Sequence, residues 1–196
     1  MLTLPYPLIL ASGSPRRKHL LEQIGLPFTV QPSEVDESLL STIGVAPDEF
    51  VKRLSLLKAQ DVARRTSQRS IVLGSDTIVV LNGHILGKPI DSDDAVRMLR
   101  SLSGMTHTLY TGIALVDSST YHSVTEVQHT DVTFRELTDD EINGYVATGS
   151  PLDKAGSYGI QDDFGAVFVA HIVGCYYTIV GLPLEMFYRT LRMFIA

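Results

Sequence analysis

The sequence contains a single cysteine, Cys175. One cysteine excludes an intramolecular disulfide framework, and it also excludes a zinc site made of cysteines alone. Proteins that work without disulfides are typical of reducing compartments. We therefore expect a cytoplasmic protein.

Basic residues are scarce as well. The chain has 16 Lys and Arg against 22 Asp and Glu, which gives a formal net charge of −6 and a pI near 5.4. A general nucleic-acid binder needs surplus Lys and Arg to displace the counterions of the phosphates. We therefore expect no stable nucleic-acid partner.

From residues 1–10 and from the one long uncharged segment, we expect neither secretion nor insertion into a membrane. Residues 1–10 have no Lys or Arg ahead of their apolar stretch and contain Pro5 and Pro7, the reverse of a signal peptide. Residues 164–184 lack Asp, Glu, Lys and Arg and are long enough to span a bilayer, but glycines and a proline divide them. Their β-branched and aromatic content predicts two buried strands around a turn at Gly174, so we expect no membrane partner.

Length and patterning predict one α/β domain that covers residues 1–196. At about 150 residues per domain, a chain of this length forms one domain, and 44% hydrophobic residues can build a sizeable core. We find no repeat, low-complexity tract or linker. Short apolar runs alternate with amphipathic segments, which is typical of a mixed sheet with flanking helices. The expected strands cover residues 8–11, 28–30, 71–73, 78–81, 84–86, 108–116 and 124–134, and the expected helices cover residues 15–24, 47–65, 91–102, 138–147 and 183–194.

The first candidate site, residues 12–18 (SGSPRRK), follows the first expected strand. Ser14 is a good N-cap and Pro15 a good first helical residue, so the helix start is well defined. Three cations then lie at the positive end of the helix dipole, where they are unfavourable. A bound phosphate would remove this conflict, and we favour it over a solvated basic turn because the cations directly follow a buried strand.

The second candidate site contains Asp76, in residues 74–77 (GSDT) between two apolar runs. One interpretation is a turn aspartate that caps its own backbone. The other is a carboxylate at a strand end that holds a divalent cation or deprotonates a water, with its basicity raised by desolvation. Thr77 would then add a hydroxyl. The residues leave both interpretations open.

Two lysines and an acidic loop are weaker candidates. Lys58 lies near the buried face of the helix expected at 47–65, and Lys88 follows the strand expected at 84–86. A lone lysine usually extends its ammonium group into water. Glu34, Asp36 and Glu37 carry the oxygen ligands that Mg²⁺ prefers, although a solvated acidic loop is the commoner arrangement.

The last candidate site is residues 153–161 (DKAGSYGIQ). Its glycines suit close approach of the backbone to a ligand, and Gln161 offers a paired donor and acceptor to the edge of a base. A plain glycine-containing turn explains the glycines equally well. The sequence has no nucleophile elbow and no histidine or cysteine pattern typical of zinc, which argues against serine hydrolases and zinc enzymes.

Taken together, these segments closely resemble the Maf family of nucleoside triphosphate pyrophosphatases. The resemblance runs nearly end to end, and its specificity lies in the order and spacing of motifs that are individually modest. These motifs are residues 11–17 (ASGSPRR), 75–77 (SDT), 86–89 (LGKP), 103–104 (SG), 153–156 (DKAG) and 180–183 (VGLP).

The resemblance implies a fold similar to that of inosine triphosphate pyrophosphatases: a mixed twisted sheet with flanking helices and two lobes around a cleft. It implies cleavage between the α and β phosphates of a nucleoside triphosphate, with Mg²⁺ or Mn²⁺ as cofactor. It further implies the following roles: Asp76 accepts the proton of the attacking water, Lys58 and Lys88 act with it in catalysis, Ser12, Arg16, Arg17, Thr77 and Gln161 bind substrate, and Asp36 and Asp76 contact the metal.

Three positions distinguish the branches of this family. The branch that acts on dTTP and UTP carries Arg, Thr and Gln, as this chain does at Arg16, Thr77 and Gln161. The branch that acts on 7-methyl-GTP usually carries Trp, Gln and Glu instead. The chain departs from the family after Gln161, where Asp162 and Asp163 replace the usual Gly and lengthen the loop by one residue.

The resemblance therefore implies a pyrophosphatase that acts on dTTP and UTP. Modified pyrimidine nucleotides are a further class of substrate that it allows. A homodimer is a further implication. Two alternatives remain: a 7-methyl-GTP pyrophosphatase of the same family, and a regulator that binds nucleotides without hydrolysing them. The carboxylate and lysine set argues against the regulator, because binding alone does not require a carboxylate that activates water.

Overall fold

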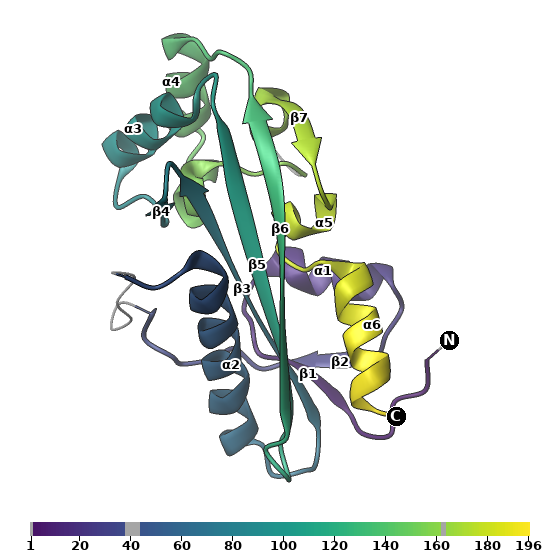
Figure 1. Cartoon of the computed structure of the whole chain (residues 1–196). Helices are drawn as coiled ribbons and strands as arrows, with labels where there is room; N and C mark the ends of the chain where they lie inside the picture. The colour runs from purple at the N-terminus through teal and green to yellow at the C-terminus, as the bar shows by residue number, and fades with distance from the viewer. Residues whose placement is uncertain (1, 38–43, 162–163) are drawn as a thin grey trace. The chain divides into compact units, whose positions relative to one another are not determined.

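The computed structural model describes residues 2–37, 44–161 and 164–196. The chain divides into two compact units (Figure 1). The first unit comprises Met1–Asp76, Thr111–Gln128 and Gly181–Ala196, and the second comprises Thr77–Tyr110 and His129–Val180. Each unit has a hydrophobic core of its own.

In the described part of the chain, the strands form a seven-stranded sheet in the order β2-β1-β3-β5-β6-β7, with β4 paired to β3 outside this path. β1 pairs in parallel with β2 and β3, whereas β4 is antiparallel to β3 and β7 is antiparallel to β6. The mixed sheet with flanking helices expected from the sequence is thus confirmed. The strands are β1 (Leu8–Leu10), β2 (Phe28–Val30), β3 (Ile71–Leu81), β4 (His84–Leu86), β5 (Thr106–Asp117), β6 (Ser123–Phe134) and β7 (Val169–Val173).

The first unit contains the helices α1 (Pro15–Gln23), α2 (Pro47–Arg65) and α6 (Leu184–Phe194). The long helix α2 begins with a proline, has acidic residues in its first turn and has arginines in its last, as the helix dipole favours. Its apolar face packs on the sheet. The core of this unit contains Ile9, Ala11, Ala59, Val62, Ala63, Val72, Ala114 and Val116.

The second unit contains α3 (Ser92–Leu102), α4 (Asp139–Ala147) and α5 (Tyr176–Val180). Thr138 and Glu141 have the spacing typical of a capping box, and α4 begins with one. The Thr138 side chain accepts from the Glu141 N–H, and the Glu141 carboxylate accepts from the Thr138 N–H. Large side chains fill the core of this unit. They include Leu99, Leu102, Leu109, Phe134, Tyr145, Tyr158 and Phe168.

Most predicted elements are confirmed, but two predictions near β3 are wrong. The strands expected at 71–73 and 78–81 are one continuous strand, so Asp76 lies inside β3 and not in a turn or at a strand end. The polar residues in the middle remain extended because their side chains find buried partners. Ser75 Oγ donates to the carbonyl of Gly181, and Asp76 accepts from Lys58.

The segment from 164 to 184 also departs from expectation. It begins with a short 3-10 helix (Phe164–Phe168) and continues as β7, an edge strand that is largely exposed. The second expected strand is the short helix α5. The Thr130 hydroxyl accepts from the N–H of Cys175 and donates to its carbonyl, each at 3.0 Å. Because these bonds occupy the backbone groups of Cys175, and Gly174 has a φ of 130°, the strand ends at this point.

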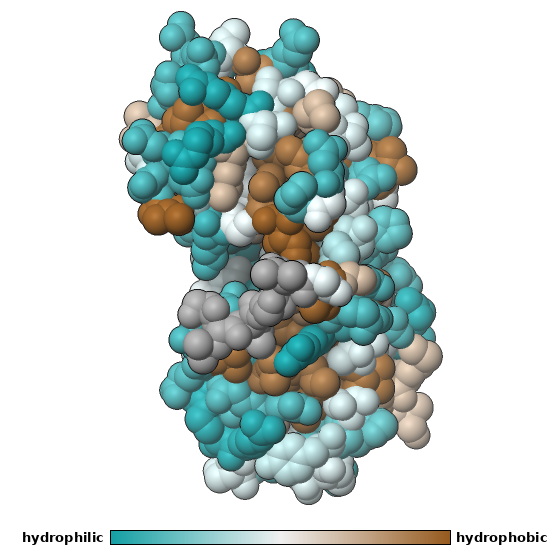
Figure 2. Space-filling view, turned by 60° about the vertical axis from the view of Figure 1, so that its left-hand side comes forward, coloured by the Kyte–Doolittle hydropathy of each residue, from teal (hydrophilic) through white to brown (hydrophobic). Residues whose placement is uncertain are grey.

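The surface is mixed. Figure 2 shows hydrophilic residues over much of the face that it presents, with apolar residues in smaller groups between them. Within the described residues, no helix combines the length and the apolar character needed to cross a membrane.

Candidate functional site

Helix α2 lies directly against β3 because Gly74 has no side chain. A Cβ at this position would lie 2.1 Å from the carbonyl oxygen of Ser55 and 2.9 Å from the nitrogen of Ala59. Gly112 on β5 has the same role, since a Cβ there would lie 2.6 Å from the carbonyl oxygen of Val51. The two glycines therefore allow the backbone of α2 to pack in close contact with the backbone of β3 and β5.

This packing brings Lys58 and Asp76 together. Alternate residues of a strand share a face, so Asp76 points to the same side of β3 as Gly74, toward α2. Lys58 Nζ lies 2.6 Å from Asp76 Oδ1 and 2.7 Å from Glu37 Oε1. The side chains of Lys58 and Asp76 are only 10% and 11% exposed, whereas that of Glu37 is 54% exposed. The ammonium group thus joins a buried carboxylate to one that faces solvent.

The electrostatic environment makes Asp76 more basic than an ordinary aspartate. Burial raises the pKa of Asp76, and the negative charge of Glu37 raises it further. The positive charges of Lys58 and Arg17 act in the opposite direction. A buried carboxylate with a raised pKa and flanking cations has the properties of a general base.

A second network, around Arg17, lies in the same unit. Arg17 Nε donates to the carbonyl of Gly181 at 2.9 Å, and Arg17 Nη1 donates to Ser12 Oγ at 3.0 Å. Ser12 Oγ also accepts from the N–H of Ser14, the N-cap of α1, and Ser75 Oγ shares the Gly181 carbonyl. The start of α1 is therefore connected to the residue that immediately precedes Asp76.

Burial lowers the pKa of Arg17, and the positive charge of Arg16 lowers it further, whereas Asp76 and Glu37 raise it. The first turn of α1 contains no acidic residue. The Arg17 guanidinium acts on Asp76, Arg16 acts on Arg17, and both arginines lie in the first turn of α1. This concentration of positive charge at a helix N-terminus favours an anion such as phosphate.

The remaining predicted residues, Thr77, Lys88 and Gln161, belong to the second unit. Thr77 is half-buried next to Asp76 in the sequence, and Lys88 is exposed after β4. The segments that carry Lys88 and Gln161 are joined, because the N–H of Gly156 donates to the carbonyl of Gly87 at 3.0 Å. Asp162 and Asp163 lie outside the described residues.

The site contains several residues whose role the sequence did not reveal. Glu37 was one of three acids in a loop, and nothing in the sequence distinguished it as the partner of Lys58. Glu34 lies apart from this contact, since it pairs with Arg65 at 3.1 Å on the surface. Gly74 and Gly181 act through close packing and a backbone carbonyl, which become visible only when distant segments meet.

In the described part of the chain, no three His, Cys, Asp or Glu side chains converge closely enough to hold a metal ion by themselves. Glu37 and Asp76 nevertheless meet at Lys58, and Asp36 precedes Glu37 in the chain. Mg²⁺ is usually held by one or two carboxylates together with substrate phosphates. These oxygen donors fit that mode of binding.

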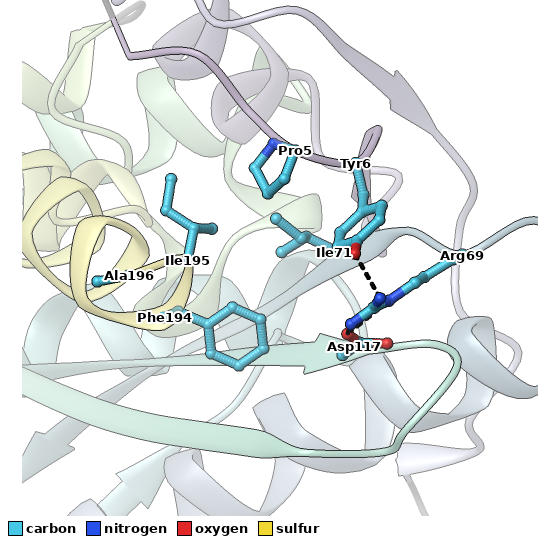
Figure 3. Close-up of a pocket in the computed structure, with 8 residues that line it drawn as sticks. All are labelled: Pro5, Tyr6, Arg69, Ile71, Asp117, Phe194, Ile195 and Ala196. Atoms are coloured by element: carbon cyan, nitrogen blue, oxygen red, sulfur yellow. Dashed lines mark hydrogen bonds and ion pairs between the residues drawn. The ribbon is translucent and has the colours of Figure 1, made fainter.

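A separate cavity of about 260 Å³ lies in the first unit (Figure 3). At its polar end, Arg69 donates to Asp117 Oδ2 at 2.7 and 3.0 Å and also contacts the Tyr6 hydroxyl. Asp117 Oδ1 accepts from the N–H groups of Ser119 and Thr120. Because these groups satisfy one another, we assign no ligand to this cavity. It is lined by Pro5, Tyr6, Arg69, Ile71, Asp117, Phe194, Ile195 and Ala196.

Comparisons with known proteins identify the family of the chain. Residues 7–194 match the model of the family described as Maf-like protein. A protein of Bacillus cytotoxicus named dTTP/UTP pyrophosphatase is 54% identical over 188 residues, which cover 95% of this chain and 94% of that protein. A protein of Acetivibrio thermocellus with the same name is 50% identical over 183 residues, 90% of each chain.

Among solved structures, a dITP/XTP pyrophosphatase from Mycobacterium abscessus is 15% identical and covers 65% of this chain and 74% of its own, with a TM-score of 0.41. A likeness at this level carries no inference about activity.

Proposed function

Because the chain belongs to the Maf-like protein family, we propose that it is a nucleoside triphosphate pyrophosphatase that hydrolyses dTTP and UTP to the monophosphate and pyrophosphate. The observation that carries the reaction is the buried contact of Lys58 with Asp76, beside the cationic start of α1. The substrate follows from two relatives with at least 50% identity over nine-tenths of the chain.

In this proposal, Asp76 is the general base. A water oxygen attacks the α-phosphorus, the bond from that phosphorus to the oxygen bridging to the β-phosphate breaks, and pyrophosphate leaves with the bonding electron pair. The proton of the water passes to the carboxylate of Asp76. The raised pKa of Asp76 supports this role, because a more basic carboxylate accepts a proton more readily.

The cationic residues stabilise negative charge. Arg16 and Arg17 bind phosphate oxygens at the start of α1, with Ser12 holding the Arg17 guanidinium in place. Lys58 and Lys88 stabilise charge on the triphosphate and on the leaving pyrophosphate. Phosphoryl transfer requires positioned positive charge more than it requires a protein nucleophile, which agrees with this set of residues.

A divalent cation, Mg²⁺ or Mn²⁺, completes the proposed site. Asp76 and Asp36 are the proposed contacts, and Glu37 is the further carboxylate that the geometry adds. When bound, the cation supplies neutralisation of the charge on the phosphate oxygens. Lys58 then has two roles, since it orients Asp76 and balances the negative charge of Glu37.

Thr77 and Gln161 face the base in this proposal, and with Arg16 they define the pyrimidine branch. We further propose that residues 1–196 act as a single domain in the cytoplasm, where a protein with one cysteine needs no disulfide. A homodimer follows from the resemblance alone.

The test is pyrophosphate release by the purified protein with Mg²⁺ and, separately, with Mn²⁺. The substrates are UTP, dTTP, CTP, ATP, GTP and 7-methyl-GTP. Release from UTP and dTTP above the others supports the proposal. Preference for 7-methyl-GTP would refute the specificity residues but keep the reaction, and binding measured by calorimetry without any release would indicate a regulator.

A further inference from the structure

Residues 156–159 of the second unit are attached to four different parts of that unit, one contact for each successive residue. The outer two contacts come from backbone N–H groups and the inner two from side chains. They are Gly156 N–H to the Gly87 carbonyl, Ser157 Oγ to Met98 Sδ, Tyr158 Oη to His107 Nε2, and Gly159 N–H to Tyr145 Oη.

The backbone of this segment is held in a conformation that needs such contacts. Gly156 and Ser157 both have positive φ, 69° and 62°. The left-handed region is costly for a residue with a side chain, and such strain persists only when the surroundings enforce it. A Cβ on Gly156 would lie 2.9 Å from Val79, so the segment also packs tightly against β3.

Tyr158 is buried and carries the largest side chain of the four. Its hydroxyl lies 2.8 Å from His107 Nε2 on β5, and its ring packs edge-on against Phe134 with centroids 4.7 Å apart. His107 is 1% exposed and also packs edge-on against Phe134. The three rings form one cluster in the core of the second unit.

His107 is an unusual residue for that core. Within the described residues, its Nδ1 has no hydrogen-bond partner, and an unpaired buried polar atom costs free energy that a phenylalanine would not cost. In the described part of the chain, the hydrogen bond to Tyr158 is therefore the one interaction of His107 that an apolar side chain of the same shape would not make. Burial lowers the pKa of His107 to about 4 and raises the pKa of Tyr158, so both groups are neutral near pH 7.

We propose that His107 is a positioning residue for nucleotide binding. Its hydrogen bond holds Tyr158 in place, and Tyr158 in turn holds the segment that carries Gln161. This inference rests on the proposed function, in which Gln161 faces the base. Gln161 follows the last of the four contacts by two residues, and Gly156 joins the segment to the one that carries Lys88. Release of Tyr158 therefore loosens the supports of both side chains.

The decisive variants are His107→Phe, Tyr158→Phe and the double variant. Phenylalanine keeps a ring at either position and removes the hydrogen bond. Each single variant leaves one buried polar group unpaired, whereas the double variant leaves neither and should recover most of the stability. Thr108→Val is the matched control, because it removes a hydrogen bond from the next residue of β5, where the hydroxyl donates to Asp131 at 2.7 Å.

We expect KM and the dissociation constant for UTP to rise about threefold to tenfold in all three ring variants. A change of this size corresponds to the loss of one ordinary hydrogen bond. The kcat of each variant should stay within about twofold of the wild-type value. The control should leave both constants unchanged. A purely structural role predicts that KM returns to the wild-type value in the double variant along with stability, and that result would overturn the proposal.

Hydrogen exchange of the Gly156 and Gly159 amides gives a readout that is independent of turnover. Both amides should exchange at least about fivefold faster in the three ring variants than in the wild type and the control. Unchanged exchange together with an unchanged UTP dissociation constant would refute the role of His107. Absence of pyrophosphate release by the wild type would instead refute the proposed function, and the exchange data would still decide whether His107 positions the segment.

Discussion

Gly74→Ala tests whether close packing of α2 on β3 positions Lys58 for catalysis. The added Cβ would lie 2.1 Å from the carbonyl oxygen of Ser55, and real Cβ atoms essentially never approach closer than 3.0 Å. The obstructing atom belongs to the backbone, so α2 itself must move away from β3 by about 1 Å, and a shift of that size costs roughly a hundredfold in rate.

The same shift lengthens the contact of Lys58 with Asp76, which is 2.6 Å in the wild type, beyond hydrogen-bond range. Overpacking should also lower the free energy of unfolding by about 1–3 kcal/mol. Urea unfolding gives the folded fraction, and pyrophosphate release from UTP, corrected for that fraction, gives the rate.

Gly144→Ala is the matched control for this experiment. Gly144 is an exposed residue of α4 with open space at its Cβ position, so alanine should raise stability by about 0.5–1 kcal/mol and leave the rate unchanged. Wild-type turnover in folded Gly74→Ala protein would refute the argument that this glycine positions the site.

Three further predictions follow. Asp76→Asn should keep the fold and lower kcat for pyrophosphate release at least about a hundredfold, because the amide cannot accept the proton. Near-normal turnover would show that Asp76 is not the general base. Lys58→Gln should lower kcat/KM for UTP at least about tenfold. The control Lys52→Gln removes a surface ion pair with Glu49 on the same helix and should leave kcat/KM unchanged. Equal losses in both variants would show that removal of any lysine charge from α2 lowers activity, and not the loss of Lys58 in particular. Burial lowers the pKa of His107 from 6.5 to about 4, so the folded state binds fewer protons than the unfolded state between these pH values. On account of this group, the free energy of unfolding should fall by about 3 kcal/mol from pH 7 to pH 4. Urea unfolding should show that this free energy depends less on pH in His107→Phe than in the wild type, and an equal dependence would contradict the prediction.

Local sequence signals predicted the fold well where one element determines its own structure. The capping box of α4 and the start of α1, where Ser14 is the N-cap and Pro15 the first helical residue, are properties of a few neighbouring residues. The failures occur where distant partners decide. Residues 74–77 look like a turn because they are polar and begin with glycine, but partners from α2 and from Gly181 hold them extended.

The candidate site divides in the same way. The residue types and the motif order indicated Asp76, Lys58 and the start of α1 as candidates. The sequence could not indicate that Glu37 shares Lys58 with Asp76, because a loop acid has no local signature of its partner. It also assigned no role to His107, since a lone histidine in a strand has no motif, and its value depends on Tyr158, 51 residues away.

In the proposed mechanism, water attacks the α-phosphorus of a pyrimidine nucleoside triphosphate. Hydrolysis of UTP by the wild-type protein in ¹⁸O-labelled water, with the products analysed by mass spectrometry, tests this most directly. Attack at the α-phosphorus places one labelled oxygen in the phosphate of UMP and none in pyrophosphate. Label in pyrophosphate, or release of inorganic phosphate in place of pyrophosphate, would contradict it.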